Sequence, residues 1–324
     1  MRQNEIGIDL DDLFRGDRRT LGKAITLIES SKSSDKIKKE ALLKAALPHS
    51  QKSFRLGISG VPGVGKSTFI ESFGLMLIEK GHRVAVLAID PSSPLNGGSI
   101  LGDKTRMEQL SQHQNAFIRP SPSQCFLGGV AQATRESIIL CEAAGYDFII
   151  VETVGVGQSE TEVSSMVDFF MLLTLPNAGD EIQGIKKGIL ELAHAVVVNK
   201  ADGKLELDAE IAKKQFENVL GLFHHPQDYS TKAFAVSSLT KKNLNELYSE
   251  LADFKKFLGT DGLKKLRSEQ HSKWFEKLIL EIISQKITSD PKLIQSKNNF
   301  KAKIQNDELT ALAAAENFCQ LLLK

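Results

Sequence analysis

The stretch Gly60-Val-Pro-Gly-Val-Gly-Lys-Ser-Thr68 decides the fold of this chain. It follows a short β-rich run at 54–59 and opens a segment with helical spacing, which is the context that a phosphate-binding loop requires. Glycines allow backbone N–H groups to turn toward a phosphate, and the start of the following helix adds the positive end of its dipole. The stretch therefore predicts a P-loop that binds a nucleoside triphosphate.

The side chains of this loop have separate expected tasks. Lys66 is predicted to reach the β- and γ-phosphates, and the Ser67 hydroxyl to bind Mg²⁺. A glycine-rich turn without a ligand would explain the glycines but not the coincidence of strand, complete motif and helix. The predicted phosphate-binding residues are Gly60, Val61, Pro62, Gly63, Val64, Gly65, Lys66, Ser67 and Thr68.

Outward from this loop, β-rich runs alternate with helical stretches as far as about residue 257. Further strands are predicted at 83–89, 147–151, 169–175, 195–199 and 233–236. The alternation is typical of an α/β fold, here a P-loop NTPase with a mostly parallel sheet covered by helices on both faces. Ligands of such sheets bind beyond the carboxyl ends of the strands, so the loops after these runs should carry the function.

Helical patterns flank this region and suggest three parts. We predict an N-terminal helical arm at 1–50, a nucleotide-binding domain at 51–258 and a C-terminal helical extension at 259–324. The extension has an apolar stripe through Trp274, Leu278 and Ile282, then a break at 289–291, a polar stretch and a last helix at 307–323. Such stripes need a partner surface, either the chain's own core or another subunit.

The composition limits the function classes. The chain has 324 residues with 41% hydrophobic and 25% charged residues, and its net charge of +1 gives no general attraction to nucleic acid or anionic membrane. Three widely spaced cysteines, Cys125, Cys141 and Cys319, fit a reducing compartment. The first twenty residues lack an apolar signal core, and no apolar run is long enough to cross a bilayer. We therefore expect a cytoplasmic protein that binds neither nucleic acid nor membrane.

A second motif, Asn199-Lys200-Ala201-Asp202, follows a buried run and points to guanine. Asp202 can accept two hydrogen bonds, from guanine N1 and from its exocyclic amine, and adenine presents no such pair of donors. Lys200 would lie along the plane of the base. The turn Ser237-Ser238-Leu239 is a further candidate for base contact, although serine-rich turns are common.

Acidic residues near the ends of strands are candidates for Mg²⁺ and for the attacking water. Asp90 and Glu152 end β-rich runs, and Asp103 lies in the glycine-rich segment 97–106. A carboxylate beside a phosphate-bound Mg²⁺ can hold a metal-bound water or orient the attacking one, so Asp90 and Glu152 join Lys66 as predicted catalytic residues. The Gly155 N–H is placed to contact the γ-phosphate, which would let the loop at 154–159 move on hydrolysis. A helix cap or a surface salt bridge is the alternative for either acid.

Together, the segments between Gly60 and Asp202 resemble the MeaB/ArgK group of P-loop GTPases. The matching segments include GVPGVGKST at 60–68, VAVLAIDPSS at 84–93, GGSILGDKTRM at 97–107, IVETVGVGQSE at 150–160 and VVVNKADG at 196–203. The resemblance implies a GTPase chaperone that gates cofactor loading and protection of an adenosylcobalamin-dependent mutase of the methylmalonyl-CoA mutase type. It also implies a homodimer built by the C-terminal helices. Asp90 and Asp103 would lie in the first switch, Glu152 in the second, and 176–187 would form a third.

Two features depart from familiar patterns. Ser123-Gln-Cys-Phe126 stands where relatives show small residues, so the bulky Phe126 would alter a switch contact or serve packing. Val156, rather than a glutamine, follows Gly155, which predicts slow GTP hydrolysis that a partner completes.

Three other functions stay open. A nickel-delivery GTPase usually needs a His-rich tract or a Cys pair near the phosphate loop, and this sequence has neither there. An ATP- or GTP-dependent kinase or ATPase linked to lysine, arginine and ornithine transport is an older description of the family, and the guanine motif argues against ATP. The third is a catalytically idle scaffold whose nucleotide serves only as structural support.

Overall fold

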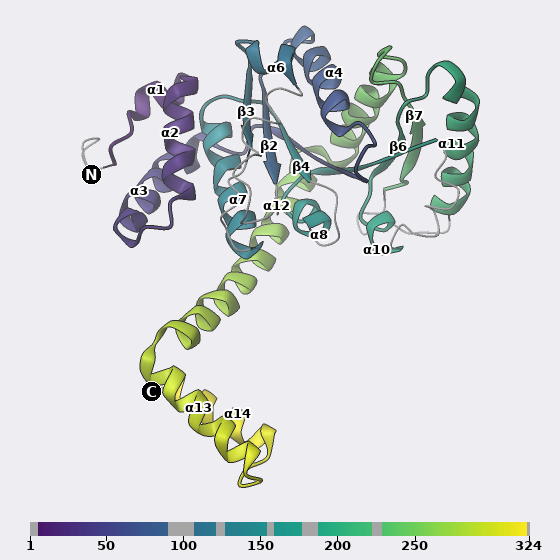
Figure 1. Ribbon diagram of the computed structural model, residues 1–324. Coiled ribbons are helices and arrows are strands. Elements are labelled where there is room, and N and C mark those ends of the chain that lie inside the picture. Colours follow the sequence, from purple (N-terminus) through teal and green to yellow (C-terminus); the bar gives the residue numbers. More distant parts are fainter. Residues whose placement is uncertain are drawn as a thin grey trace. The chain divides into compact units, whose positions relative to one another are not determined.

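The structure is a computed structural model that describes residues 6–89, 107–120, 127–153, 159–176, 187–221 and 229–322 (Figure 1). Within these residues, seven parallel strands form one sheet in the order β3-β2-β4-β1-β5-β6-β7. The strands are β1 (Phe54–Gly60), β2 (Val84–Ile89), β3 (Ala116–Pro120), β4 (Phe148–Thr153), β5 (Phe169–Thr174), β6 (Ala195–Val198) and β7 (Lys232–Ala235). The predicted α/β class, with further helices toward both ends of the chain, is confirmed.

Helices cover both faces of the sheet. Alternate residues of each buried strand point to opposite faces, so both faces are apolar and both need helices packed against them. On β4, Ile149 and Val151 join one hydrophobic core, whereas Phe148 and Ile150 join the other. The first core is shared with α2 (Arg18–Glu29), α3 (Lys36–Ala46), α7 (Leu127–Ala143) and α11 (Glu206–Leu220). The second is shared with α4 (Lys66–Glu79), α6 (Glu108–Gln112) and the first turns of α12 (Leu244–Ser289).

The described chain also contains shorter helical elements. They are α1 (Leu10–Phe14), α8 (Ser159–Ser164), α10 (Lys187–Leu190) and the 3-10 helices Ser33–Asp35, Leu47–His49 and Gly203–Leu205. No helix in the described ranges combines the length and the apolar character that a membrane span needs.

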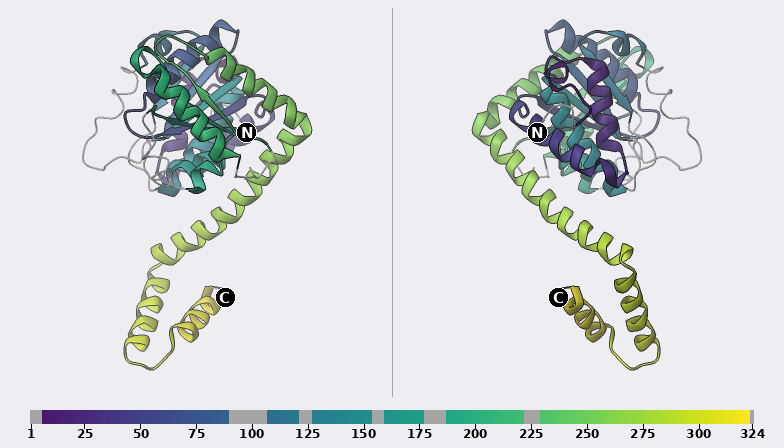
Figure 2. Two further views of the ribbon diagram at one scale, coloured as in Figure 1. Left: turned by 90° about the vertical axis from the view of Figure 1, so that its right-hand side faces the viewer. Right: turned by 90° about the vertical axis from the view of Figure 1, so that its left-hand side faces the viewer.

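The N-terminal helices pack into the same core as the sheet. Leu21, Ala24, Ile25 and Ile28 form the buried face of α2, which contacts α7, and the right-hand view of Figure 2 shows these purple helices over the sheet. The side chain of Arg119 at the end of β3 pairs with Glu29 of α2. These helices therefore support both α7 and the carboxyl end of β3.

The topology places the P-loop at the middle of the sheet. β1 lies between β4 and β5, and it runs into the loop at 61–65 and then into α4. Phe69, Ile70 and Phe73 anchor α4 beneath this loop because all three are fully buried. The chain leaves β1 toward β2 on one side and later crosses from β4 to β5 on the other, and such a reversal is where ligands of these sheets bind.

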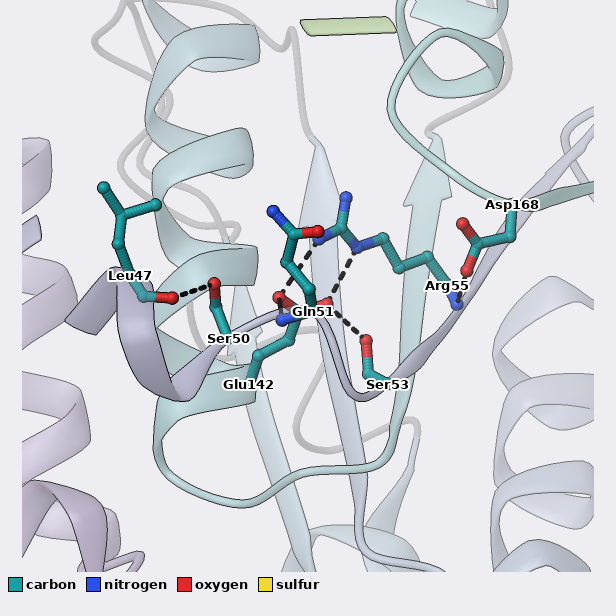
Figure 3. Close-up of polar contacts among 7 residues, drawn as sticks. All are labelled: Leu47, Ser50, Gln51, Ser53, Arg55, Glu142 and Asp168. Carbon is teal, nitrogen blue, oxygen red and sulfur yellow. Dashed lines mark hydrogen bonds and ion pairs between the residues drawn. The ribbon is translucent and has the colours of Figure 1, made fainter. Parts of the chain in front are cut away.

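A buried ion pair fastens α7 to the opposite, amino end of β1 (Figure 3). The carboxylate of Glu142 accepts hydrogen bonds from Nε and Nη2 of Arg55 at 2.9 and 3.0 Å, from Ser53 Oγ at 2.6 Å and from the backbone N–H of Gln51 at 2.7 Å. Burial by itself raises the pKa of Glu142, but the charge of Arg55 and these hydrogen bonds together lower it. The carboxylate is therefore ionised and fully paired.

Two elements differ from the sequence prediction. The edge strand β3 is not among the predicted strands, because its five residues include Arg119 and end at Pro120, and proline is tolerated in a sheet chiefly at such edges. The polar stretch after residue 290 is a helix, α13 (Pro291–Gln305). Pro291 occupies its first turn, and the Asp290 carboxylate caps it by accepting from the N–H of Lys292 at 2.8 Å.

The chain divides into two compact units, residues 1–266 and 267–324. Within the second unit, α13 contacts α14 (Ala311–Leu322), with the rings of Phe300 and Phe318 6.3 Å apart. Near the predicted boundary at 259, the backbone of Gly259 leaves the helical conformation with φ of 60°. The three-part division by function stays a prediction.

Candidate nucleotide-binding site

The P-loop has the backbone conformation that its glycines predict. Gly63 and Gly65 both have positive φ, 81° and 92°. A Cβ atom at Gly65 would lie 2.9 Å from Nδ2 of Asn199, so a side chain there would be strained and would also push away the neighbouring loop. The sequence of the loop is therefore matched both to its own turn and to the segment beside it.

Lys66, the first residue of α4, closes over the P-loop. Its ammonium donates to the carbonyl oxygens of Gly60 at 2.7 Å and Val61 at 3.3 Å. Burial lowers the pKa of Lys66, and the negative charges of Glu152 and Glu160 act in the opposite direction. The cation is thus held by neutral carbonyl oxygens at the start of a helix, where phosphate oxygens are favourable partners.

The predicted guanine motif is joined directly to the P-loop. Asn199 is 1% exposed, and its Nδ2 donates to the carbonyl of Val64 at 2.9 Å. Its Oδ1 accepts from the Ser238 hydroxyl at 2.7 Å and from the Ser238 N–H at 3.3 Å. One buried amide therefore links the three loops that follow β1, β6 and β7.

The remaining residues of the motif lie beside this link. Lys200, with φ of 63°, donates from Nζ to the carbonyl of Gly63 at 2.8 Å. The Asp202 carboxylate accepts from the hydroxyl of Ser237, and Leu239 is exposed. The structure therefore brings together the P-loop and both segments that the sequence predicts to contact the base.

The acidic candidates are only partly within the described residues. Glu152 lies near the end of β4, is 7% exposed and pairs in register with Ile58 of β1. Ser67 is half-buried and Thr68 exposed in the first turn of α4. Asp90, Asp103, Gly155 and the departing segment 123–126 lie outside the described residues.

The structure also shows contributors that the sequence reasoning missed. Asn199 was predicted to bind guanine, but its amide holds the loops in place, and its contact with the base stays a prediction. Ser72 of α4 donates to the carbonyl of Ser238 at 2.7 Å, which adds a second link between α4 and that turn. Glu160 is 6% exposed and acts electrostatically on Lys66. Of the two residues that the sequence reasoning did not name, Ser72 and Glu160, only Glu160 had a sequence signal, since it follows the glycine-rich segment 155–157.

This chain is similar to known GTPases over most of its length. Residues 21–292 match the family described as methylmalonyl-CoA mutase-associated GTPase MeaB. The GTPase ArgK of Escherichia coli strain K12 is 47% identical over 267 residues, which are 82% of this chain and 81% of that protein. The mitochondrial methylmalonic aciduria type A homolog of Mus musculus is 42% identical over 324 residues, which are 96% of this chain and 77% of that protein.

A solved structure extends the likeness to the fold. The structure described as LAO/AO transport system kinase matches with a TM-score of 0.80 and 34% identity, and the match covers 100% of this chain and 99% of that one. The family match includes the P-loop, the guanine motif and α12 as far as its end at Ser289. The chain therefore belongs to the MeaB family of methylmalonyl-CoA mutase-associated GTPases, and it is a P-loop GTPase.

Proposed function

We propose that this protein hydrolyses GTP with Mg²⁺ and uses its nucleotide state to gate cofactor loading and protection in an adenosylcobalamin-dependent acyl-CoA mutase. The observation that carries the proposal is family membership over residues 21–292, together with a P-loop tied to the guanine motif through Asn199. The name of the mouse relative, methylmalonic aciduria type A homolog, supports a client of the methylmalonyl-CoA mutase type. Hydrolysis would convert one mutase-binding state into the other.

The residues near the P-loop fit a magnesium ion. Mg²⁺ prefers oxygen ligands, and the Ser67 hydroxyl lies in the first turn of α4, while the buried Glu152 carboxylate acts on the neighbouring Lys66. We propose that Ser67 holds the ion, with Asp90, Asp103 and Glu152 as the acidic partners. The bound ion would neutralise charge on the phosphates.

The protein's own groups would supply the remaining catalysis. Lys66 would exchange the carbonyls of Gly60 and Val61 for phosphate oxygens, and it would stabilise the charge that develops as the γ-phosphoryl group leaves. Glu152 or Asp90 would orient the attacking water. Because Val156 follows Gly155, intrinsic hydrolysis should be slow until a partner completes the site.

Base selectivity gives the first test. Asp202 would accept from guanine N1 and the exocyclic amine, and Lys200 would cover the base. Calorimetric titration should show GDP binding at least about a hundredfold tighter than ADP, because an unmatched buried carboxylate strongly disfavours the wrong base. Equal affinities would refute the guanine assignment.

Client capture gives the second test. The protein, loaded with GDP or with a non-hydrolysable GTP analogue, would be used to capture partners from extract of its native cell. A cobalamin-dependent mutase should be recovered in amounts that depend on the nucleotide. Recovery of no cobalamin enzyme in either state would refute the chaperone function and leave the GTPase intact.

The described likeness to a transport system kinase favours one second candidate, transfer of the γ-phosphoryl group to an acceptor. With γ-labelled GTP, hydrolysis places all label in inorganic phosphate, whereas a kinase would place it in protein or a small molecule.

We also propose that the protein is cytoplasmic and forms a homodimer through residues 259–324. The large exposed apolar side chains Phe275, Leu280 and Ile282 of the second unit support the dimer.

A further inference from the structure

The short helix α8 begins at Ser159, the last residue of the segment 154–159 that we expect to move on hydrolysis. It packs on the sheet over β1, β4 and β5, on the same face as α7. The contacts that hold α8 fix the first described residues that follow 154–158. They are therefore candidates for control of GTP hydrolysis at a distance from the phosphates.

The first contact is a close approach to Gly57 of β1. A Cβ atom at Gly57 would lie 2.9 Å from Val163 Cγ1, Val167 Cγ2 and Phe170 Cδ2. Val163 belongs to α8 and is fully buried, so α8 rests almost directly on the backbone of the strand that leads into the P-loop. This close packing of α8 on β1 is possible because residue 57 has no side chain.

The second contact is a buried arginine at the carboxyl end of α8. Arg135 of α7 donates from Nη1 to the carbonyl of Ser165 at 3.0 Å and from Nη2 to the Ser165 hydroxyl at 2.6 Å. That hydroxyl in turn donates to the carbonyl of Glu162 at 2.7 Å, in the last turn of the helix. A cation in this position satisfies carbonyl groups at a helix end and opposes the negative end of its dipole.

The guanidinium remains charged although it is buried. Arg135 is 8% exposed, and burial lowers its pKa to about 10, while the charge of Glu162 acts in the opposite direction. Burial of an arginine has a large desolvation cost, and a neutral side chain of similar length would avoid that cost. The hydrogen bonds to Ser165 need a planar donor with two N–H groups in one direction, which arginine provides.

The other end of α8 points toward the nucleotide site. Glu160 lies in its first turn, is 6% exposed, and its charge acts on Lys66. The helix therefore joins two charged groups, the P-loop lysine at its start and Arg135 at its end. A shift of α8 relative to β1 would move Glu160 and so change the electrostatic potential at Lys66.

We propose that Arg135 and Gly57 are positioning residues for GTP hydrolysis, because they fix α8, and with it Glu160, relative to Lys66. The inference rests on the GTPase activity and on the expected movement of the segment 154–159 on hydrolysis. It is independent of the identity of the client. The hydrogen bonds of Arg135 described above go to Ser165, outside the P-loop, and Gly57 lies three residues before Gly60 on β1.

The test compares Arg135→Met, Arg135→Lys and Gly57→Ala with the wild-type protein, without any mutase. Single-turnover GTP hydrolysis, GDP affinity and melting temperature would be measured for each. Arg135→Met should slow hydrolysis about ten- to a hundredfold, the range expected when reacting groups are misplaced by about 1 Å. GDP affinity should stay within about twofold, since the P-loop and the guanine motif keep their contacts.

Arg135→Lys separates positioning from simple charge. One ammonium can reach the Ser165 carbonyl or its hydroxyl but cannot match both in the arginine geometry, so hydrolysis should recover only in part. Gly57→Ala changes no charge and displaces α8 from the sheet side, so it should also slow hydrolysis with little change in GDP affinity. If Arg135→Met fails to fold, Arg135→Lys and Ser165→Ala carry the same test.

The matched control changes a different buried contact, farther along α7 at Glu142. The double variant Arg55→Met/Glu142→Leu removes the other buried arginine contact of α7 and keeps the hydrogen bonds of Arg135 to Ser165. The charge of Arg55 lowers the pKa of Arg135, so its removal keeps that guanidinium charged, and the hydrolysis rate should equal that of the wild type. Wild-type hydrolysis by folded Arg135→Met would overturn the proposal. So would a loss of hydrolysis that merely follows a loss of GDP binding and of folded protein. Failure to capture a mutase would leave this inference intact, because no mutase is present in the assay.

Discussion

The two ends of the sheet hold their charged side chains in opposite ways. At the amino end, the Glu142 carboxylate accepts four hydrogen bonds, two of them from the cation Arg55. At the carboxyl end, the Lys66 ammonium donates to two neutral carbonyl oxygens. Among the described residues, the buried Thr174 hydroxyl at the end of β5 has no hydrogen-bond partner.

The difference separates stability from function. In the Arg55–Glu142 pair, the hydrogen bonds of the carboxylate are made inside the protein, so it is not available to bind a ligand. The pair instead holds α7 to β1. A lysine held by neutral oxygens can exchange them for phosphate oxygens and gain a charge-assisted hydrogen bond. Variants at the amino end should therefore change unfolding, whereas variants at the carboxyl end should change nucleotide chemistry.

The largest expected effect follows from breaking the ion pair. Arg55→Met leaves the Glu142 carboxylate buried without its cation, so the free energy of unfolding should fall by about 3–5 kcal/mol. Arg55→Met/Glu142→Leu should restore most of this loss, because apolar side chains of similar size can replace a buried pair. Urea unfolding of the GDP-bound protein would measure both. A double variant as unstable as the single one would contradict the pairing argument.

Acid should remove the stability contributed by the same pair. The folded-state pKa of Glu142 lies below the ordinary value of 4.5, so its contribution is complete above about pH 4.5 and is lost as the pH falls through the folded-state pKa. The melting temperature, measured from about pH 6 to about pH 3, should fall less in the double variant than in the wild type. Parallel curves would show that Glu142 does not carry this dependence.

At the carboxyl end, Lys66→Ala should leave the fold nearly unchanged and slow GTP hydrolysis by about 10²- to 10³-fold, as expected when one preorganised donor to a developing charge is removed. Single-turnover assays with saturating GTP and Mg²⁺ measure the rate, and calorimetry checks that the variant is folded. Wild-type turnover in this variant would mean that the proposed mechanism is wrong.

A smaller effect is expected at the link between the two loops. Asn199→Asp replaces the Nδ2 donor with an oxygen facing the Val64 carbonyl, so the P-loop loses its tie to the guanine motif. A buried acceptor left unmatched costs about 1–3 kcal/mol, so GDP affinity should fall roughly tenfold to a hundredfold. Titration with GDP measures the loss. Unchanged affinity would show that the two loops are placed independently.

The smallest effects are expected for two threonines at the carboxyl ends of neighbouring parts of the sheet, Thr153 on β4 and Thr174 on β5. Thr153→Val removes a hydrogen bond of 2.8 Å from Thr153 Oγ1 to Ser59 Oγ, and it should cost about 1 kcal/mol of stability. Thr174→Val removes a buried hydroxyl that has no partner among the described residues, so stability should stay equal or rise by up to about 1 kcal/mol. Unfolding curves measured in parallel would decide. Equal losses would show that Thr174 has a partner after all.

Local patterns were enough to predict much of this molecule. The apolar runs of β1, β2, β4 and β5 are strongly patterned, and the P-loop and guanine motifs are short and contiguous. β3 has only five residues and one neighbour, so its pattern carries too little signal. The start of α13 did have a signal, an aspartate followed by a proline, which reads equally as the end of a helix.

The links within the site were harder to predict because they join residues far apart in the chain. Nothing near Asn199 in the sequence indicates that its amide reaches Val64, and the same holds for Ser72 and Ser238. Arg135 reads as an ordinary residue of an amphipathic helix until Ser165 is placed beside it. A lone glutamate in the apolar run at 138–146 was the one local sign of the ion pair at Glu142.

Helix α7 carries both buried arginine contacts, and their spacing has a consequence for changes in chain length. Arg135 and Glu142 are seven positions apart (135 to 142), which is close to two turns of about 3.6 residues, so both project from one side of the helix. Deleting one residue between them would rotate Glu142 by about 100° and shift it by about 1.5 Å relative to Arg135. Arg135 could then not reach Ser165 while Glu142 also reached Arg55. The length of this segment should therefore tolerate less variation than the identity of most residues within it.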